Sequence, residues 1–480
     1  MCGEWKLYHS RLSIIAPSDR YAQPYMTASG DTIVFNGEIL NFRELLDLHD
    51  LPQIESDTAA LMALLDLDDF DLSEIEGFFA FVRINRHGEL THCARDRFGV
   101  KPLFIHKNGP YISVSSEASV LSDIFDLPYS ENALEEYHAF RAPVFSGSYF
   151  EGVETVTPGT CLVSGKFFEP LEFFDSSYQD PQGLTAELEV AIRDAVQSRM
   201  VADVPVGLLF SGGIDSNLLS HLSATSLHRF CGGMAGDYDM EFARLDAQKQ
   251  GAHVTTLVEV GDSEFRQRFH DMIRLRKEPL SVPNEVILSF LAEEWANQGG
   301  KVLISGEAAD EFFAGYDRVY RWAFCADHFE IDEFINLYCY LPRSQISERI
   351  VNSMNEFFSA LQGMSPFEMV RYFFVKMHLP VLFRRLDFAL MFSGIEGREP
   401  FASRDIFKLA MKFSPGDLLF GDLGKLPLRI LAEKALGRDF AFAPKIGFPV
   451  DLGRIFHGTE SVDRLDNYEI WFEENLKALK

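Results

Sequence analysis

The chain has 480 residues, 47% of them hydrophobic and 24% charged, so it is expected to fold as two compact units. Its formal net charge of -28 would repel a phosphate backbone, which argues against a nucleic-acid partner. Six cysteines without a C-x-x-C pair favour a reducing compartment, and no apolar run is long enough to span a membrane, so a cytoplasmic protein without a membrane partner is expected.

Up to about residue 175, short apolar runs alternate with turn residues, which predicts a strand-rich region. The runs are LSIIAP, DTIVFNGE, GFFAFVRINRHGELTHCARD, YISVSS and TCLVSGKFF. Residues 85–88 predict a hairpin turn, and helices are predicted at 42–48 and 58–66. Residues 4–15 contain no Gly or Pro, which predicts a single strand. The polar stretch FFDSSYQDPQG predicts a linker, with domains at 1–178 and 179–480.

The second region alternates helical and strand patterns. TAELEVAIRDAVQSRM has apolar residues at helical spacing, and VPVGLLF is a continuous apolar run typical of a buried parallel strand. RFCGGM and KVLISG predict further strands, each preceded by helical sequence. Together they predict a doubly wound α/β sheet, followed from about residue 325 by a mostly helical part.

A glycine-rich turn, residues 211–216, lies directly between VPVGLLF and a helical pattern. Such a turn directs backbone N–H groups and the positive end of a helix dipole at one point, which suits a phosphate. The pattern S-G-G-x-D-S resembles the loop of enzymes that cleave ATP between the α and β phosphates, and DVPVGLLFSGGIDS resembles its asparagine synthetase form. The resemblance implies that Asp215 binds Mg²⁺, and that the ATP contacts are Leu209, Ser211, Gly212, Gly213, Asp215, Ser216 and Gly232.

Three later segments are similar to the same family. In LISGEAADEFFAGY, the resemblance places Ser305 and Gly306 at ATP and assigns Glu307 to the chemistry of the acyl-adenylate. GIEGREPF and the pair Gly424-Lys425 match family landmarks. PKIGF places Lys445 where the family has a lysine that stabilises the departing phosphates.

The N-terminal region resembles a class II glutamine amidotransferase, in which a cysteine exposed as the first residue attacks the amide of glutamine. The resemblance implies removal of Met1, with Cys2 as nucleophile and its α-amino group, titrating near about pH 8, as base. Asn36 and Gly37 would supply oxyanion donors. The implied glutamine-binding residues are Arg11, Leu12, Ser13, Asn36, Gly37, Glu38 and Asp57, with Arg11 on the α-carboxylate and Glu38 and Asp57 on the α-ammonium.

The sequence departs from the family in both regions. Relatives have several dozen residues between the cysteine and the Arg11 strand, and a straight strand here would leave Cys2 about 30 Å from Arg11. Either the chain folds back near Gly3, or the start is truncated, or free ammonia replaces glutamine. In the second region, Lys277-Glu278-Pro279 stands where relatives have D-E-P, and a lysine cannot bind a second magnesium ion. The acceptor segment LSVPNEVILSF has no arginine or lysine, and two family glycines are replaced by Ala308 and Ala314.

The resemblance therefore implies an α+β N-terminal nucleophile (αββα) glutaminase domain, followed by a doubly wound adenine-nucleotide alpha-hydrolase-like synthetase domain with a helical C-terminal part. The implied activity is adenylation of a carboxylate, with aspartate as the family's acceptor, and amidation by ammonia from glutamine, using ATP and Mg²⁺. A sugar acid or natural-product carboxylate as acceptor, an ammonia-only enzyme and a catalytically silent nucleotide-binding regulator stay open. The oligomeric state, a homodimer included, stays open as well.

Overall fold

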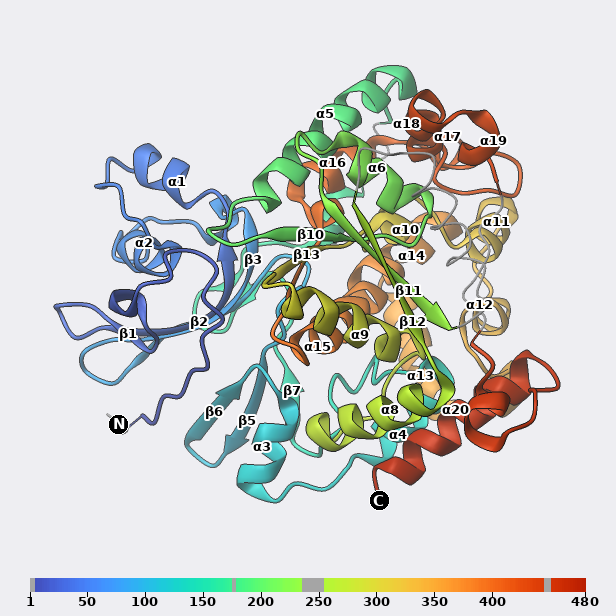
Figure 1. Ribbon diagram of the computed structural model, residues 1–480, viewed down its shortest axis with the longest axis horizontal. Coiled ribbons are helices and arrows are strands. Elements are labelled where there is room, and N and C mark those ends of the chain that lie inside the picture. The colour runs from blue at the N-terminus through green and yellow to red at the C-terminus, as the bar shows by residue number, and fades with distance from the viewer. Residues whose placement is uncertain (1–4, 175–177, 235–253, 444–449) are drawn as a thin grey trace.

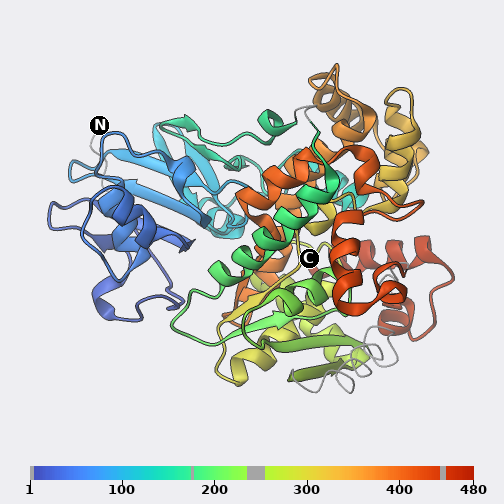
Figure 2. The ribbon, with the colours of Figure 1, turned by 90° about the horizontal axis from the view of Figure 1, so that it is seen from above.

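The computed structural model describes residues 5–174, 178–234, 254–443 and 450–480. Cys2 and Lys445, two of the predicted catalytic residues, lie outside these ranges. The described elements form two groups that lie beside one another (Figure 1), and the view from above shows the blue N-terminal elements at one end (Figure 2). The domain boundary between residues 178 and 179 stays a prediction.

The first group contains two antiparallel sheets. The larger has the order β1 (Tyr25–Met26), β2 (Thr32–Ile39), β3 (Gly77–Ile84), β4 (Leu90–Arg95), β8 (Thr160–Cys161) and β9 (Gly165–Lys166). The smaller has the order β6 (Tyr111–Ser115), β5 (Phe104–Asn108) and β7 (Val153–Thr155). The helices of this group are α1 (Phe42–Leu48), α2 (Asp57–Leu64), α3 (Ala118–Phe125), α4 (Glu131–Phe140), and the short 3-10 turns η1 (Asp19–Tyr21), η2 (Leu72–Glu74) and η3 (Pro170–Phe173).

Three apolar clusters hold these layers together. Ala80, Cys93, Leu103, Ile105 and Val156 form the cluster between the two sheets. On the outer face of the larger sheet, β2 packs against α1 and α2, and on the outer face of the smaller sheet, β5 packs against α3 and α4. Because strand side chains alternate between faces, each sheet can bury one face on the other sheet and one on helices. The predicted αββα arrangement is confirmed.

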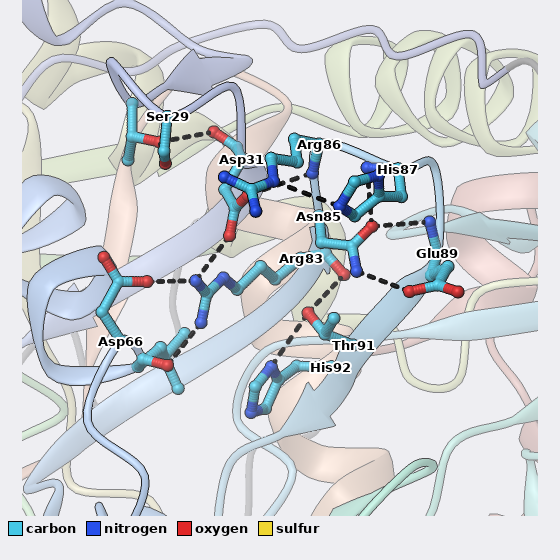
Figure 3. Close-up of polar contacts among 12 residues, drawn as sticks. Ser29, Asp31, Asp66, Arg83, Asn85, Arg86, His87, Glu89, Thr91 and His92 are labelled. Carbon is cyan, nitrogen blue, oxygen red and sulfur yellow. Dashed lines mark hydrogen bonds and ion pairs between the residues drawn. The ribbon is translucent and has the colours of Figure 1, made fainter.

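The predicted hairpin joins β3 to β4 (Figure 3). Asn85 accepts bonds from the amides of His87 and Glu89 and donates to the Glu89 carboxylate, which fixes the turn. Next to it, Arg83 is buried and donates to Asp31 at 2.7 Å, and it also contacts Asp66. Arg83 thus joins β3 to the chain before β2 and to the chain after α2.

The prediction of one strand over residues 4–15 is wrong, because residues 5–15 contain no strand. The guanidinium of Arg11 donates to the carbonyls of Ile15, Ala16 and Ser18, and Ala16 has a φ of 46°. These bonds curl the chain after Arg11. The amide of Ala16 donates to the carboxylate of Asp203, so the backbone here is satisfied by a distant residue instead of a neighbouring strand.

The second group is built on a five-stranded parallel sheet. Its order is β12 (Thr255–Val260), β11 (His228–Met234), β10 (Val206–Leu209), β13 (Val302–Ile304) and β14 (Glu396–Arg398). Leu208 and Ile304 face α5 (Pro181–Arg199) and α6 (Ile214–Leu222), whereas Phe230 and Leu303 face α9 (Asn284–Asn297) and α15 (Leu379–Met391). Helices on both faces confirm the doubly wound fold. Because α5 begins at Pro181, the end of the predicted linker is helical.

The remaining described elements are helices, and those from residue 331 onward form the helical C-terminal part that the sequence predicts from about residue 325. They are α8 (Asp262–Arg276), α10 (Ala309–Phe312), α11 (Asp317–Cys325), α12 (Ile331–Tyr338), η4 (Arg343–Gln345), α13 (Glu348–Ser359), α14 (Pro366–Phe373), η5 (Phe374–His378), η6 (Pro400–Ala402), α16 (Arg404–Lys412), α17 (Pro415–Leu418), α18 (Leu426–Leu436), α19 (Arg438–Ala441), η7 (Gly453–His457) and α20 (Arg464–Ala478). Across the described ranges, none of the helices combines the length and the apolar character needed to cross a membrane.

Buried polar contacts join the two groups. Lys101 of the first group is 2% exposed, and its Nζ lies 2.7 Å from an Oδ1 of Asp387 on α15. The hydroxyl of Tyr137 donates to the carbonyl of Leu280 at 2.9 Å. A buried lysine needs a paired carboxylate to offset its desolvation, so this interface fixes how the two groups sit on each other.

Candidate active site

The predicted phosphate loop lies at the carboxyl end of β10. Ser211 and Gly213 are exposed, Gly212 has a φ of 76°, and α6 begins at Ile214. The side-chain amide of Asn217 donates to the carbonyls of Gly212 at 3.0 Å and Gly213 at 3.1 Å, which holds the turn in shape. The first N–H groups of a helix have no partner within the helix, so the open turn offers donors to an anion.

Asp215, in the first turn of α6, has one engaged and one unengaged carboxylate oxygen. Its Oδ2 accepts a bond of 2.6 Å from Nζ of Lys425, which also lies 2.8 Å from Oδ1 of Asp310. Its Oδ1 is buried and has no hydrogen-bond partner among the described residues. Lys425 is 5% exposed at the start of α18 and was not among the predicted site residues, although the pair Gly424-Lys425 before a helix was noticed.

A magnesium ion fits these groups. Carboxylate oxygens are its preferred protein ligands, and the buried unpaired Oδ1 of Asp215 is such an oxygen. No cluster of three or more His, Cys, Asp or Glu side chains suited to a metal occurs within the described ranges. Magnesium is usually bound by one or two carboxylates together with phosphates and waters.

The strand end after β13 faces the loop. A Cβ atom added to Gly306 would lie 3.0 Å from Cβ of Asp215, which is a tight contact, so glycine suits the close approach of these two segments. Figure 1 shows α6 and α10 beginning near the ends of β10 and β13. The structure therefore brings Ser305, Gly306 and Glu307 beside the loop, as the carboxyl ends of neighbouring parallel strands should be.

Glu307 is half-buried and lies 3.4 Å from a guanidinium nitrogen of Arg385 on α15. Two further carboxyls nearby are buried. Burial raises the pKa of Glu311 to about 8, and the charges of Asp310 and Glu307 add to the shift. Burial also raises the pKa of Glu399 to about 8, against the opposing effect of Lys101. Sequence reasoning missed Arg385, which belongs to no local motif, and did not single out Glu399 within the segment GIEGREPF.

Leu209 and Gly232, predicted to lie along adenosine, are on the face of the sheet that α9 covers. Leu209 packs against the cluster around Phe230, and a Cβ on Gly232 would lie 2.7 Å from Leu291 of α9. Close packing of α9 is thus one reason for a glycine at position 232. The contact of either residue with adenosine stays a prediction.

In the first group, Asn36 and Gly37 lie on β2, paired with Ala80 and Phe79 of β3. Gly37 has a φ of 121°, and a Cβ there would overlap the carbonyl of Phe78. Only glycine tolerates this conformation, so the Asn-Gly pair marks a special backbone position and is not an ordinary turn. Its role as an oxyanion donor stays a prediction.

Glu38 and Asp57 lie together and are both buried. Asp57 accepts bonds from the amides of Ile39 and Thr58, whereas Oε2 of Glu38 has no hydrogen-bond partner among the described residues. Burial raises the pKa of each, and the charge of Asp57 raises the pKa of Glu38 further. A cationic group between the two carboxyls would relieve their repulsion. Arg398 of β14 lies 3.7 Å from Oε1 of Glu38.

The segment around Arg11, predicted to be a strand that binds the α-carboxylate of glutamine, is not a strand and contacts other parts of the chain. Arg11 donates to three carbonyls of its own segment, Leu12 packs on the core beneath the larger sheet, and the carbonyl of Ser13 accepts a bond from Lys301. No contact joins Arg11 to Glu38 or Asp57 in the part of the chain that the structure describes. The glutamine-binding roles of these residues, and the role of Cys2, stay predictions.

Lys277 and Glu278, which stand where relatives have D-E-P, each contact a side chain of opposite charge. Lys277 ends α8 with a φ of 57° and extends to Asp123 on the surface. Glu278 is buried between two guanidinium groups, at 2.8 Å from Arg276 and 2.6 Å from Arg384. Both oxygens of Glu278 are therefore engaged by arginines in this structure.

Two family models match this chain. The model described as asparagine synthase matches residues 187–467, and the model described as glutamine amidotransferase domain matches residues 2–169. The first spans more than half of the chain and contains the loop, Glu307 and Lys425. The second contains Asn36, Gly37, Glu38 and Asp57.

Several curated proteins are similar to this chain. Asparagine synthetase [glutamine-hydrolyzing] 1 of Bacillus subtilis (strain 168) is 30% identical over 306 residues, which cover 60% of this chain and 48% of that protein. A putative asparagine synthetase of Methanocaldococcus jannaschii is 27% identical over 351 residues, which cover 67% of this chain and 60% of that protein. An amidase of Gibberella zeae, chry2, is 31% identical over 349 residues, which cover 65% of this chain and 51% of that protein. The chain thus spans about half the length of the relatives it matches.

Proposed function

Because the chain belongs to the asparagine synthase family, we propose that it is an ATP-consuming amidotransferase that adenylates a carboxylate and then replaces AMP with ammonia. The observation that carries this proposal is the juxtaposition of the open loop at residues 211–216, Asp215 and Gly306 at the carboxyl edge of the parallel sheet. An open turn beside a carboxylate and a catalytic glutamate suits a nucleotide whose α phosphate is attacked.

In the first step, a carboxylate oxygen of the acceptor attacks the α phosphorus of ATP, and the bond to the β phosphate breaks to release pyrophosphate. The loop amides, Ser211 and Ser216 hold the phosphates. Lys425, next to Asp215, supplies a fixed positive charge, and Lys445 would add a second. Mg²⁺, when bound at Asp215, offsets the negative charge of the phosphates.

In the second step, ammonia attacks the acyl carbon, the nitrogen loses a proton, and AMP leaves. Glu307 is the base proposed for that proton, and its contact with Arg385 holds the carboxylate in place. The resulting products are an amide, AMP and pyrophosphate.

Ammonia would come from glutamine in the first group. Cys2, with its own amino group as base, would attack the glutamine amide, and Asn36 and Gly37 would stabilise the oxyanion. Glu38 and Asp57 would hold the α-ammonium of glutamine, whose positive charge would relieve the repulsion from Asp57 that helps to raise the pKa of Glu38. Arg11 would bind the α-carboxylate with the donors that its own segment leaves unused.

The test measures pyrophosphate release with MgATP, an acceptor panel, and either glutamine or ammonium. The rate of pyrophosphate release should fall at least about 100-fold in Asp215→Asn with either nitrogen donor, because Asp215 serves the reaction with glutamine and with ammonium alike. Cys2→Ala should lose only the glutamine-supported rate, whereas an unchanged Cys2→Ala would identify an ammonia-only enzyme. ATP binding without pyrophosphate release for any acceptor would refute the proposal and favour a silent regulator.

A further inference from the structure

A cavity of about 230 Å³ lies between the two groups of elements. Five cationic side chains line it, Arg95, Arg276, Lys376, Arg384 and Arg385, and no aspartate or glutamate is among its lining residues in the described chain. The whole chain has 72 acidic and 44 basic side chains, so a purely cationic lining runs against its composition. The cavity therefore favours an anionic ligand.

The positive charge of the lining is only partly compensated. Arg276 pairs with Glu278 and Glu285, Arg384 with Glu278, Lys376 with Glu169 and Arg385 with Glu307, and none of these four carboxylates is among the cavity's lining residues. Arg95 donates to three main-chain carbonyls and, among the described residues, to no carboxylate. Burial, together with repulsion from Arg384 and against the effect of Asp96, lowers the pKa of Arg95 to about 10. An anion in the cavity would relieve that repulsion.

One end of the cavity meets the proposed chemistry. Arg385 lines it and contacts Glu307 at 3.4 Å, and Ser281, from the segment that resembles the family's acceptor region, lines it too. The cation that this segment lacks in sequence is thus supplied by α15. Part of the wall is apolar and includes Val144, Met377 and Val381.

On the basis of the proposed function, we propose that this cavity receives the acceptor, and that the acceptor is a carboxylate with an apolar body and no free ammonium group. The carboxylate would lie towards Arg385 and Glu307, and the body against the apolar wall. Aspartate fits poorly, because its α-ammonium would face guanidinium groups with no carboxylate among the cavity's lining residues. The acceptor class therefore differs from that of an aspartate-using enzyme.

The test compares acceptors with the full chain, MgATP and ammonium. Pyrophosphate release with 3-phenylpropanoate and hexanoate should exceed release with aspartate by at least about 10-fold in kcat/KM. Val144→Trp should fill the apolar wall and raise the KM of these acceptors by at least about 10-fold, with the Kd of ATP unchanged. Val462→Trp, at an 89% exposed valine, is the matched control and should change nothing. Val381→Phe replaces Val144→Trp if circular dichroism shows that the latter is unfolded.

Direct binding of 3-phenylpropanoate, measured by calorimetry on the wild type and Val144→Trp, separates this inference from the proposed function. No binding, or equal binding to both proteins, would overturn the inference even if pyrophosphate is released. A preference for aspartate would overturn it as well and leave the amidotransferase standing. Loss of only the glutamine-supported rate in Val144→Trp would also overturn it, because the cavity would then be a passage for ammonia.

Discussion

Glu399 offers a test of buried charge beside the proposed active site. It is 4% exposed, and its Oε2 has no hydrogen-bond partner among the described residues. Burial raises its pKa from 4.5 to about 8, so near neutral pH the folded chain keeps a proton that the unfolded chain has lost. Stability should therefore fall as the pH rises from about 4.5 to about 8, and this group contributes no further loss above that range.

Glu399→Gln replaces the carboxyl with a neutral group of the same shape and removes this pH dependence. Between pH 4.5 and pH 7, at about 1.4 kcal/mol per pH unit, the wild type should lose roughly 3 kcal/mol relative to the variant. The variant should lie within about 1 kcal/mol of the wild type at pH 5 and be the more stable protein at pH 7 to 8.

Urea unfolding followed by tryptophan fluorescence at pH 5, 6, 7 and 8 would measure the difference. Glu151→Gln, at an exposed glutamate, is the control and should follow the wild type at every pH. A difference between Glu399→Gln and the wild type that is the same at every pH would refute the reasoning. It would mean that Glu399 is ionised in the folded chain and that Lys101 outweighs its burial.

Three further predictions concern lysines and a buried arginine. Lys277→Ala should change the rate of pyrophosphate release by less than about 2-fold and the free energy of unfolding by less than about 1 kcal/mol, because Lys277 pairs with Asp123 at the surface. A large loss of activity would contradict this and indicate that Lys277 acts near the metal. Lys425→Met should bind Mn²⁺ at least about 10-fold more tightly than the wild type in the absence of ATP, because the carboxylate of Asp215 loses its competing cation. Electron paramagnetic resonance would measure the Kd of Mn²⁺, and Lys434→Met, at an exposed lysine, is the control. Arg371→Met should lower the free energy of unfolding by about 2 to 4 kcal/mol in urea titrations, because two buried carbonyls lose their donor, and an unchanged midpoint would contradict this.

Local patterns were sufficient to predict most elements. The alternating runs predicted β2, β3 and β4, and helical spacing predicted α1, α2 and α5, because one buried face imposes a period on neighbouring residues. The failure at residues 5–15 has a specific cause. Arg11 binds its own backbone, and no periodic pattern reports a side chain that curls the segment in which it lies.

The motifs predicted that the loop and the strand end after β13 lie together, whereas the roles of their residues stay predictions. The loop at 211–216 and Gly306 meet as the strand order requires. Ala308 and Ala314, noted as replacing glycines, have φ values of 77° and 60°, where glycine is favoured. In contrast, the pairing of Glu307 with Arg385 was not predicted, because the two residues belong to separate elements and neither carries a signal for the other.

The burial of Lys101 against Asp387 bears on how the polypeptide can be divided. A fragment ending before α5 would carry this ammonium on an open surface, and the complementary fragment would keep a carboxylate without its counter-ion. Each fragment would also expose apolar area that the other normally covers, so neither should persist alone as a rigid body. The intact chain should behave as one cooperative unit and give a single calorimetric melting peak.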